Sequence, residues 1–240
     1  MKTTSFLKAL TLSIIAAFFL GFLTSCDGGD DPTPTEKKWV TAYQNITLGN
    51  QKNYTDGHFL KLKTGESVKL ENVSGQQEYM AFMIFTDYGV NNTYLTFPAN
   101  AADAATFKNE LATNRLFVQP NVGLNNWATA KMTNGMIYKV TGISAADFSS
   151  LVSSKDWATF DTYFKKCNGG QELLSFKLNY DLEPTAGNLY LLQFNGLVRA
   201  IMYAKSYVKK ADGSTAFTFD IVIESREFNA KLDLAKNLQP

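Results

Sequence analysis

Residues 188–224 decide the fold and have the sequence NLYLLQFNGLVRAIMYAKSYVKKADGSTAFTFDIVIE. The apolar run at the start of this segment ends at Asn195-Gly196, a dipeptide that favours a type I′ hairpin turn because both residues tolerate positive φ. Asp212-Gly213 turns the chain a second time. After it, residues 216–224 alternate an apolar set with a more polar one: Phe217, Phe219, Ile221 and Ile223 against Thr218, Asp220, Val222 and Glu224. Three strands joined by two short turns predict an antiparallel meander.

Several β segments also precede the meander. Lys38–Leu48 is rich in β-branched and aromatic residues, and His58–Lys63 alternates polar with apolar side chains. Thr64-Gly65-Glu66 then turns the chain into Ser67–Val73, which alternates again, so the pair predicts a hairpin. The run Tyr79–Phe85 is apolar throughout and indicates a strand that is covered on both faces.

Helical patterns interrupt the β segments in two regions. Residues 100–113 favour helix and place an apolar stripe on one side. In residues 144–166 a second helix begins at Ser144, with Asp147 as its capping-box partner, and a third begins near Ser154. The third helix carries aromatic residues that we expect in the core: Trp157, Phe160, Tyr163 and Phe164.

These patterns together predict a mainly β fold. We expect one antiparallel domain over residues 38–240, sandwich-like or barrel-like, with two or three inserted helices at about residues 100–113 and 144–166. The only domain boundary that we consider is the helical insertion near residues 98–170. A further strand is expected at Leu173–Leu178.

The N-terminus has the order of a bacterial signal peptide. Lys2 and Lys8 precede an apolar run, Ala9–Leu23, which is shorter than the ~20 residues of a membrane-spanning helix. The junction Leu23-Thr24-Ser25-Cys26 resembles a lipobox, in which the cysteine sulfur receives diacylglycerol. We therefore expect residues 1–25 to be a signal peptide, Cys26 to carry the lipid, and the Gly- and Pro-rich residues 26–37 to be a flexible tether.

The acidic residues after the lipobox suggest a destination. Asp27, Asp30 and Asp31 resemble the export signal of Bacteroidetes surface lipoproteins, which implies a protein anchored in the outer membrane and exposed at the cell surface. A periplasm-facing protein is the alternative. Loss of residues 1–25 removes two of 23 basic residues and none of 22 acidic ones, so the mature net charge is −1. A near-neutral chain lacks the basic surface that nucleic acid requires, and we expect no nucleic-acid partner.

Three further segments resemble a group of largely uncharacterised β-rich Bacteroidetes envelope lipoproteins. They are TLGNQKN at Thr47–Asn53, GHFLKLKTGE at Gly57–Glu66, and GNLYLLQFNG at Gly187–Gly196 with Ala200-Ile201 after it. The meander is also distantly similar to that of haem-binding lipoproteins of the HmuY type, which hold iron with paired His or Met ligands. This chain has a single histidine, His58, and no motif that pairs it with Met80 or Met83.

The residues offer little for catalysis or metal binding. With Cys26 lipidated, Cys167 is the one remaining thiol, and a zinc site needs clustered His and Cys. We expect no cofactor other than the covalent lipid. A glycan hydrolase needs only two carboxylates, and Glu78, Asp87 and Glu110 are available.

Binding is therefore the favoured function. Two polar loops carry aromatic residues, Tyr88 and Tyr94 in the first and Trp127 in the second, and exposed rings of this kind can stack on sugars. We expect a non-catalytic surface lipoprotein that binds a glycan, a nutrient or a protein partner through these rings. The alternatives are a secreted-type glycan hydrolase and a haem-binding lipoprotein.

Overall fold

The computed structural model describes residues 38–87, 89, 91–103, 112–140, 142–167, 180–182 and 184–226. The predicted signal peptide, Cys26 and the tether lie outside these residues. So do Tyr88, the centre of the first predicted helix at 104–111, and the strand expected at Leu173–Leu178.

The first sheet contains the predicted meander. Its order is β1-β10-β9-β8-β6, and every neighbouring pair is antiparallel. The hairpin turn between β8 and β9 has positive φ at both Asn195 (48°) and Gly196 (70°), as the sequence predicts. The bounds of the five strands are β1 Lys38–Gly49, β10 Thr215–Arg226, β9 Val198–Lys209, β8 Leu189–Phe194 and β6 Gly135–Val140.

The second sheet is built mainly from the N-terminal half of the chain. Its order is β3-β2-β4-β5-β7, again with antiparallel neighbours. The predicted hairpin is β2–β3, and every residue of β4 is buried, which confirms a strand covered on both faces. The bounds are β3 Glu66–Val68, β2 Phe59–Lys61, β4 Met80–Asp87, β5 Asn92–Thr96 and β7 Tyr180–Leu182.

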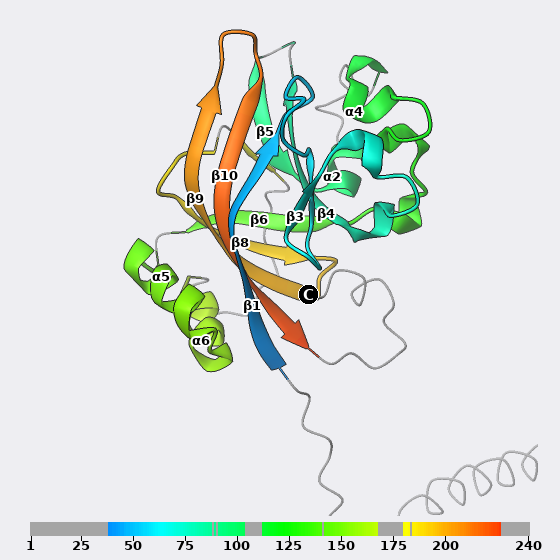
Figure 1. The fold of residues 1–240 in the computed structure, drawn as a ribbon. Coiled ribbons are helices and arrows are strands. Elements are labelled where there is room, and N and C mark those ends of the chain that lie inside the picture. The colour runs from blue at the N-terminus through cyan, green and yellow to red at the C-terminus, as the bar shows by residue number, and fades with distance from the viewer. Residues whose placement is uncertain are drawn as a thin grey trace, which may run out of the picture. The chain divides into compact units, whose positions relative to one another are not determined.

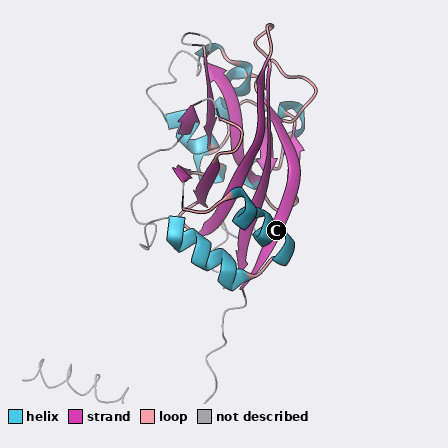
Figure 2. Ribbon diagram, turned by 90° about the vertical axis from the view of Figure 1, so that its left-hand side faces the viewer, coloured by secondary structure: helices cyan, strands magenta, loops and turns pink. Residues whose placement is uncertain are grey.

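The two sheets pack against each other around an apolar core, as the side view in Figure 2 shows. Phe82 and Ile84 of β4 meet the inward side of β10, where the predicted alternation places Phe217, Phe219, Ile221 and Ile223. The fold is therefore mainly β, and of the two arrangements expected from the sequence it is the sandwich. The turns of the meander set its register, and the alternation sets which side faces the core.

Helices cover the outer faces of both sheets (Figure 1). On the first sheet lie α5 (Ala145–Ser154) and α6 (Trp157–Cys167), whose buried faces contact Leu191, Ile201 and Val222. The capping box that begins α5 is confirmed, because the Asp147 amide donates to Ser144 Oγ (3.1 Å) and the Ser144 amide donates to Asp147 Oδ2 (2.8 Å).

The second sheet is covered by shorter helices. The first predicted helix starts two residues early, because α2 spans Pro98–Asp103 and begins at a proline, a residue suited to the first helical turn. Residues 112–113 are also helical, and residues 104–111 between them lie outside the described chain. The next described helix, α4, is only Arg115–Val118. Four 3₁₀ turns of the described chain also lie on this side: η1 Leu70–Asn72 and η2 Gln77–Tyr79 before α2, and η4 Leu124–Asn126 and η5 Thr129–Lys131 after α4.

A buried ion cluster fastens α6 to the first sheet. Arg199 on β9 donates to both carboxylate oxygens of Glu224 on β10 (2.6 Å each) and to Asp161 Oδ1 on α6 (2.9 Å). Trp157 Nε1 donates to the same Glu224 (3.1 Å). The Glu224 side chain is fully buried, although its place in the alternation puts it on the polar side of β10. The reason is that α6 packs over that side, and the arginine neutralises the carboxylate there.

Candidate functional site

The loop Asn50–Gly57 follows β1 directly and is held in place by buried amide side chains. Asn50 donates through Nδ2 to Thr86 Oγ1 (2.7 Å) and to the Gly213 carbonyl (2.8 Å), and its Oδ1 accepts from the Thr215 amide (3.1 Å). Gln51 bonds both the amide and the carbonyl of Thr86. The base of the loop is thereby joined to β4 and to the β9–β10 hairpin.

Asn53 fixes the tip of the loop. Its Oδ1 accepts from the amides of Thr55 and Asp56, both at 3.0 Å, while its Nδ2 donates to Asp56 Oδ2 and to the Thr215 carbonyl. An Asn side chain has four hydrogen-bonding positions, and all four are used here. Hydrogen bonds within the chain therefore hold the backbone around Tyr54.

Tyr54 projects from this fixed tip into solvent. Its side chain is 67% exposed, the largest value among the exposed hydrophobic residues of the described chain. The Arg115 guanidinium carbon lies 4.6 Å from the ring centroid, a cation–π contact that orients the ring. Lys69 Nζ donates to the Tyr54 carbonyl (2.8 Å), and Glu71 is ion-paired with Arg115. We call these four residues, Tyr54, Lys69, Glu71 and Arg115, the Tyr54 platform.

Arg115 is itself positioned by a buried histidine. His58 is 1% exposed, and its Nδ1 donates to the Gly49 carbonyl (3.1 Å). A carbonyl can only accept, so the Nδ1 position carries the proton and Nε2 is an acceptor. Arg115 Nη2 faces that acceptor in a long hydrogen bond of 3.4 Å and also reaches Glu71. The neutral imidazole and the carboxylate together hold the guanidinium over Tyr54.

Burial lowers the pKa of His58 below its ordinary value, and the charge of Arg115 acts in the same direction. The hydrogen bond to Gly49 and the charge of Glu71 act in the opposite direction but are outweighed, while Lys69 lowers the pKa further. The folded chain thus keeps His58 neutral at pH values where an exposed histidine is already protonated.

Because the pKa of His58 is lowered, we expect the free energy of unfolding to decrease at acid pH. As the pH falls below about 6.5, the unfolded chain binds a proton that the folded chain does not, so the free energy of unfolding decreases. The decrease continues down to the lowered pKa of the folded state, with a slope of at most about 1.4 kcal/mol per pH unit. Urea unfolding of the chain and of His58→Gln across this range isolates the effect, because the sequence has one histidine. An NMR titration that places the folded imidazole pKa at or above about 6.5 would contradict the prediction.

Two of the three aromatic residues predicted from the sequence to bind a ligand, Tyr94 and Trp127, lie in the core. Tyr94 is 4% exposed and stacks on Phe85, with ring centroids 5.5 Å apart. Trp127 is 6% exposed, packs 5.3 Å from the Phe59 ring centroid and donates Nε1 to the Val122 carbonyl (2.7 Å). Neither ring presents a stacking face to solvent here, and Tyr88 and Cys26 lie outside the described residues.

Tyr54 is not among the residues predicted to bind, although its local sequence has the same pattern as theirs. The segment Asn50–Gly57, NQKNYTDG, places one aromatic residue among turn-forming polar residues, as the two nominated loops also do. What distinguishes it is the burial of three amides beneath the ring, and that depends on contacts with Thr86, Gly213 and Thr215 from distant parts of the chain.

The carboxylates considered for hydrolysis are engaged elsewhere. Glu78 is paired with Lys131 (3.6 Å), Asp87 accepts from the Gly89 amide (2.8 Å), and Glu110 lies outside the described residues. Arg199 draws two carboxylates together, Asp161 on α6 and Glu224 on β10 beneath that helix. Glu224 is fully buried, so this pair is not open to a substrate.

The remaining candidate ligand residues are also inside the fold. Met80 and Met83 are fully buried, and both ring nitrogens of His58 already have partners, so this conformation offers no free axial ligand among the three. Burial raises the pKa of the Cys167 thiol and outweighs the opposing charge of Lys166. In the part of the chain that the structure describes, no three His, Cys, Asp or Glu side chains gather closely enough to hold a metal ion.

Comparisons with known proteins give no family or function for this chain. The chain has no match among protein-family models, curated proteins or solved structures. Within the described ranges, no helix combines the length and the apolarity that a membrane span requires.

Proposed function

We propose that this chain is a non-catalytic binding lipoprotein, anchored in the outer membrane through Cys26 and exposed at the cell surface, and that it binds a glycan at the Tyr54 platform. The observation that carries the proposal is a ring that is 67% exposed on a loop whose three buried amides hold it in one conformation. A fixed and exposed ring offers a ligand a stacking surface that does not have to be ordered on binding.

The chemistry of the Tyr54 platform suits a sugar ring. The apolar face of a pyranose stacks on an aromatic ring, while its hydroxyls need donors and acceptors at the ring edge. Arg115 lies over one face of the Tyr54 ring and is paired with Glu71, so a sugar would stack on the opposite face, with the donors of Arg115 and the acceptors of Glu71 near it. Because the loop is already ordered, a ligand does not have to offset the entropy of fixing it.

Tyr54→Ala is expected to weaken glycan binding by about tenfold or more, which corresponds to ~1.4 kcal/mol or more of stacking. A glycan array followed by calorimetry on the purified chain in detergent measures this. Tyr138→Ala is the matched control, because Tyr138 is another exposed tyrosine (42%) and lies on β6, away from the Tyr54 platform. Equal affinity of both variants and the unaltered chain would reject the Tyr54 platform as the binding site.

The anchor is tested separately from the binding site. Mass spectrometry of the protein isolated from outer membranes is expected to find diacylglycerol on Cys26 as the N-terminal residue. Cys26→Ala should abolish both the modification and the membrane fraction. Protease treatment of intact cells distinguishes the cell surface from the periplasmic face, since only a surface-exposed domain is cut.

A further inference from the structure

We infer that the glycan bound at the Tyr54 platform is anionic and carries carboxylate or sulfate groups. This inference rests on the proposed function and adds the charge of the ligand. It comes from the cations that the fold gathers around Tyr54 and from the acceptors to which they donate.

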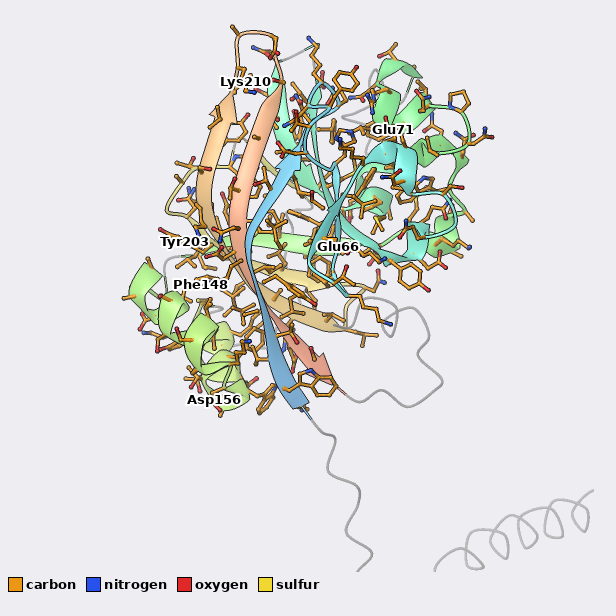
Figure 3. The ribbon with its side chains drawn as sticks, in the orientation of Figure 1. Glu66, Glu71, Phe148, Asp156, Tyr203 and Lys210 are labelled. Atoms are coloured by element: carbon orange, nitrogen blue, oxygen red, sulfur yellow. The ribbon has the colours of Figure 1, made fainter. Side chains whose placement is uncertain are left out.

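The tip of the β9–β10 hairpin lies next to the Asn50–Gly57 loop. Asn50 donates to the Gly213 carbonyl, and Lys52 Nζ donates to the Asp212 carbonyl (3.2 Å). These contacts bring Lys209 and Lys210, at the end of β9, to the same end of the domain as Tyr54. In Figure 3, Lys210 and Glu71 are both labelled toward the upper end of the view, and Asp156 lies at the lower end.

The cations at this end outnumber the acids. Five cationic side chains that are not buried lie on the segments at this end, against four carboxylates, which leaves a local charge of +1. The cations are Lys52, Lys69, Lys209, Lys210 and Arg115, and the carboxylates are Asp56, Glu71, Asp87 and Asp212.

The local carboxylates are committed to holding turns and Arg115. Asp212 accepts from the amide and the hydroxyl of Ser214 (2.8 and 2.7 Å), bonds that lower its pKa, and Asp56 accepts from Asn53 Nδ2 (2.7 Å). Lys69 has a different kind of partner, since it donates to the Tyr54 carbonyl, a neutral acceptor. An anionic group on a sugar stacked over Tyr54 would give Lys69 a charged partner, which makes the shorter and stronger kind of hydrogen bond.

The experiment compares two pairs of polymers that differ in charge. The purified chain in detergent is titrated with polygalacturonate and its fully methyl-esterified form, and with dextran sulfate and unmodified dextran. We expect at least tenfold tighter binding of a charged polymer than of its neutral counterpart, weakened by added NaCl because the contacts are partly exposed. The first pair identifies a carboxylate ligand and the second a sulfate ligand.

The variant Lys69→Gln/Lys210→Gln is expected to lower the affinity for the preferred charged polymer three- to tenfold, to reduce its salt dependence, and to leave the thermal midpoint unchanged. Lys139→Gln is the control, because Lys139 is an exposed lysine on β6, and this variant should bind the polymer normally. Equal, Tyr54-dependent affinity for charged and neutral polymers would overturn the anionic ligand and leave the glycan-binding function intact. Binding of no polymer in a Tyr54-dependent way would overturn the function itself.

Discussion

Glu224→Ala is expected to destabilise the domain by about 3 kcal/mol, because it leaves the Arg199 guanidinium, whose side chain is 15% exposed, without its main partner. Arg199 makes two hydrogen bonds to Glu224, and its guanidinium carbon lies 4.9 Å from the Phe164 ring centroid. Asp161 cannot replace Glu224, since it already bonds Arg199 Nη1 and is shared with Lys165. Urea unfolding at neutral pH, followed by tryptophan fluorescence, measures the loss directly, because Trp157 reports on the same cluster.

The matched control replaces the whole pair. Arg199→Met/Glu224→Leu removes both charges and fills similar volume, so its stability should lie close to that of the unaltered chain and well above that of Glu224→Ala. A loss of less than about 1 kcal/mol for Glu224→Ala would show that water or a rearranged side chain compensates for the missing carboxylate.

Asn50→Ala is expected to cost about 2–4 kcal/mol and to loosen the Asn50–Gly57 loop. The substitution removes the Asn50 partner of the Gly213 carbonyl and of the Thr215 amide, and each buried group left unpaired is unfavourable. The Thr86 hydroxyl also loses Asn50 but keeps its bond to the Thr93 hydroxyl (2.9 Å). Hydrogen exchange should rise in this loop and at the β9–β10 tip, and glycan affinity should fall even though Tyr54 is unchanged. Urea unfolding gives the total cost.

Asn126→Ala is the corresponding control at an exposed position. Its side chain donates to the Gln119 carbonyl (3.1 Å) at the surface, where water replaces the lost donor, so a change below about 0.5 kcal/mol is expected. If the two asparagine variants were equally stable, the buried amides would not be what holds the Tyr54 platform.

The meander and the capping box could be predicted because their signals are local. Asn195-Gly196 specifies its turn through backbone preferences of two adjacent residues, and Ser144 and Asp147 cap a helix over three residues. Alternation along β10 identified the core side, since a strand places successive side chains on opposite faces. None of these inferences requires knowledge of which segment packs on which.

The burial of individual side chains could not be predicted in the same way. Glu224 is covered because α6, more than 50 residues earlier in the sequence, lies over it. Trp127 lies in the core because Phe59 packs against it from a distant strand, and Tyr54 stays outside because Arg115 supports only one face of its ring. A loop with an aromatic residue looks the same in the sequence whether another segment covers it or not.

The position of Tyr54 immediately after β1 has a mechanical consequence. The chain enters the described domain at Lys38, runs through β1 to Gly49, and reaches Tyr54 five residues later. If the lipid at Cys26 holds one end and a bound polymer pulls on Tyr54, the covalent path of the load runs along β1 and into the Asn50–Gly57 loop. This path is not fully extended, because β1 has a bulge between Tyr43 and Ile46, with Asn45 at a φ of 56°. The hydrogen bonds of Asn50, Gln51 and Asn53 therefore lie within the stretch of chain that carries the load, whereas most of the sandwich core lies outside it.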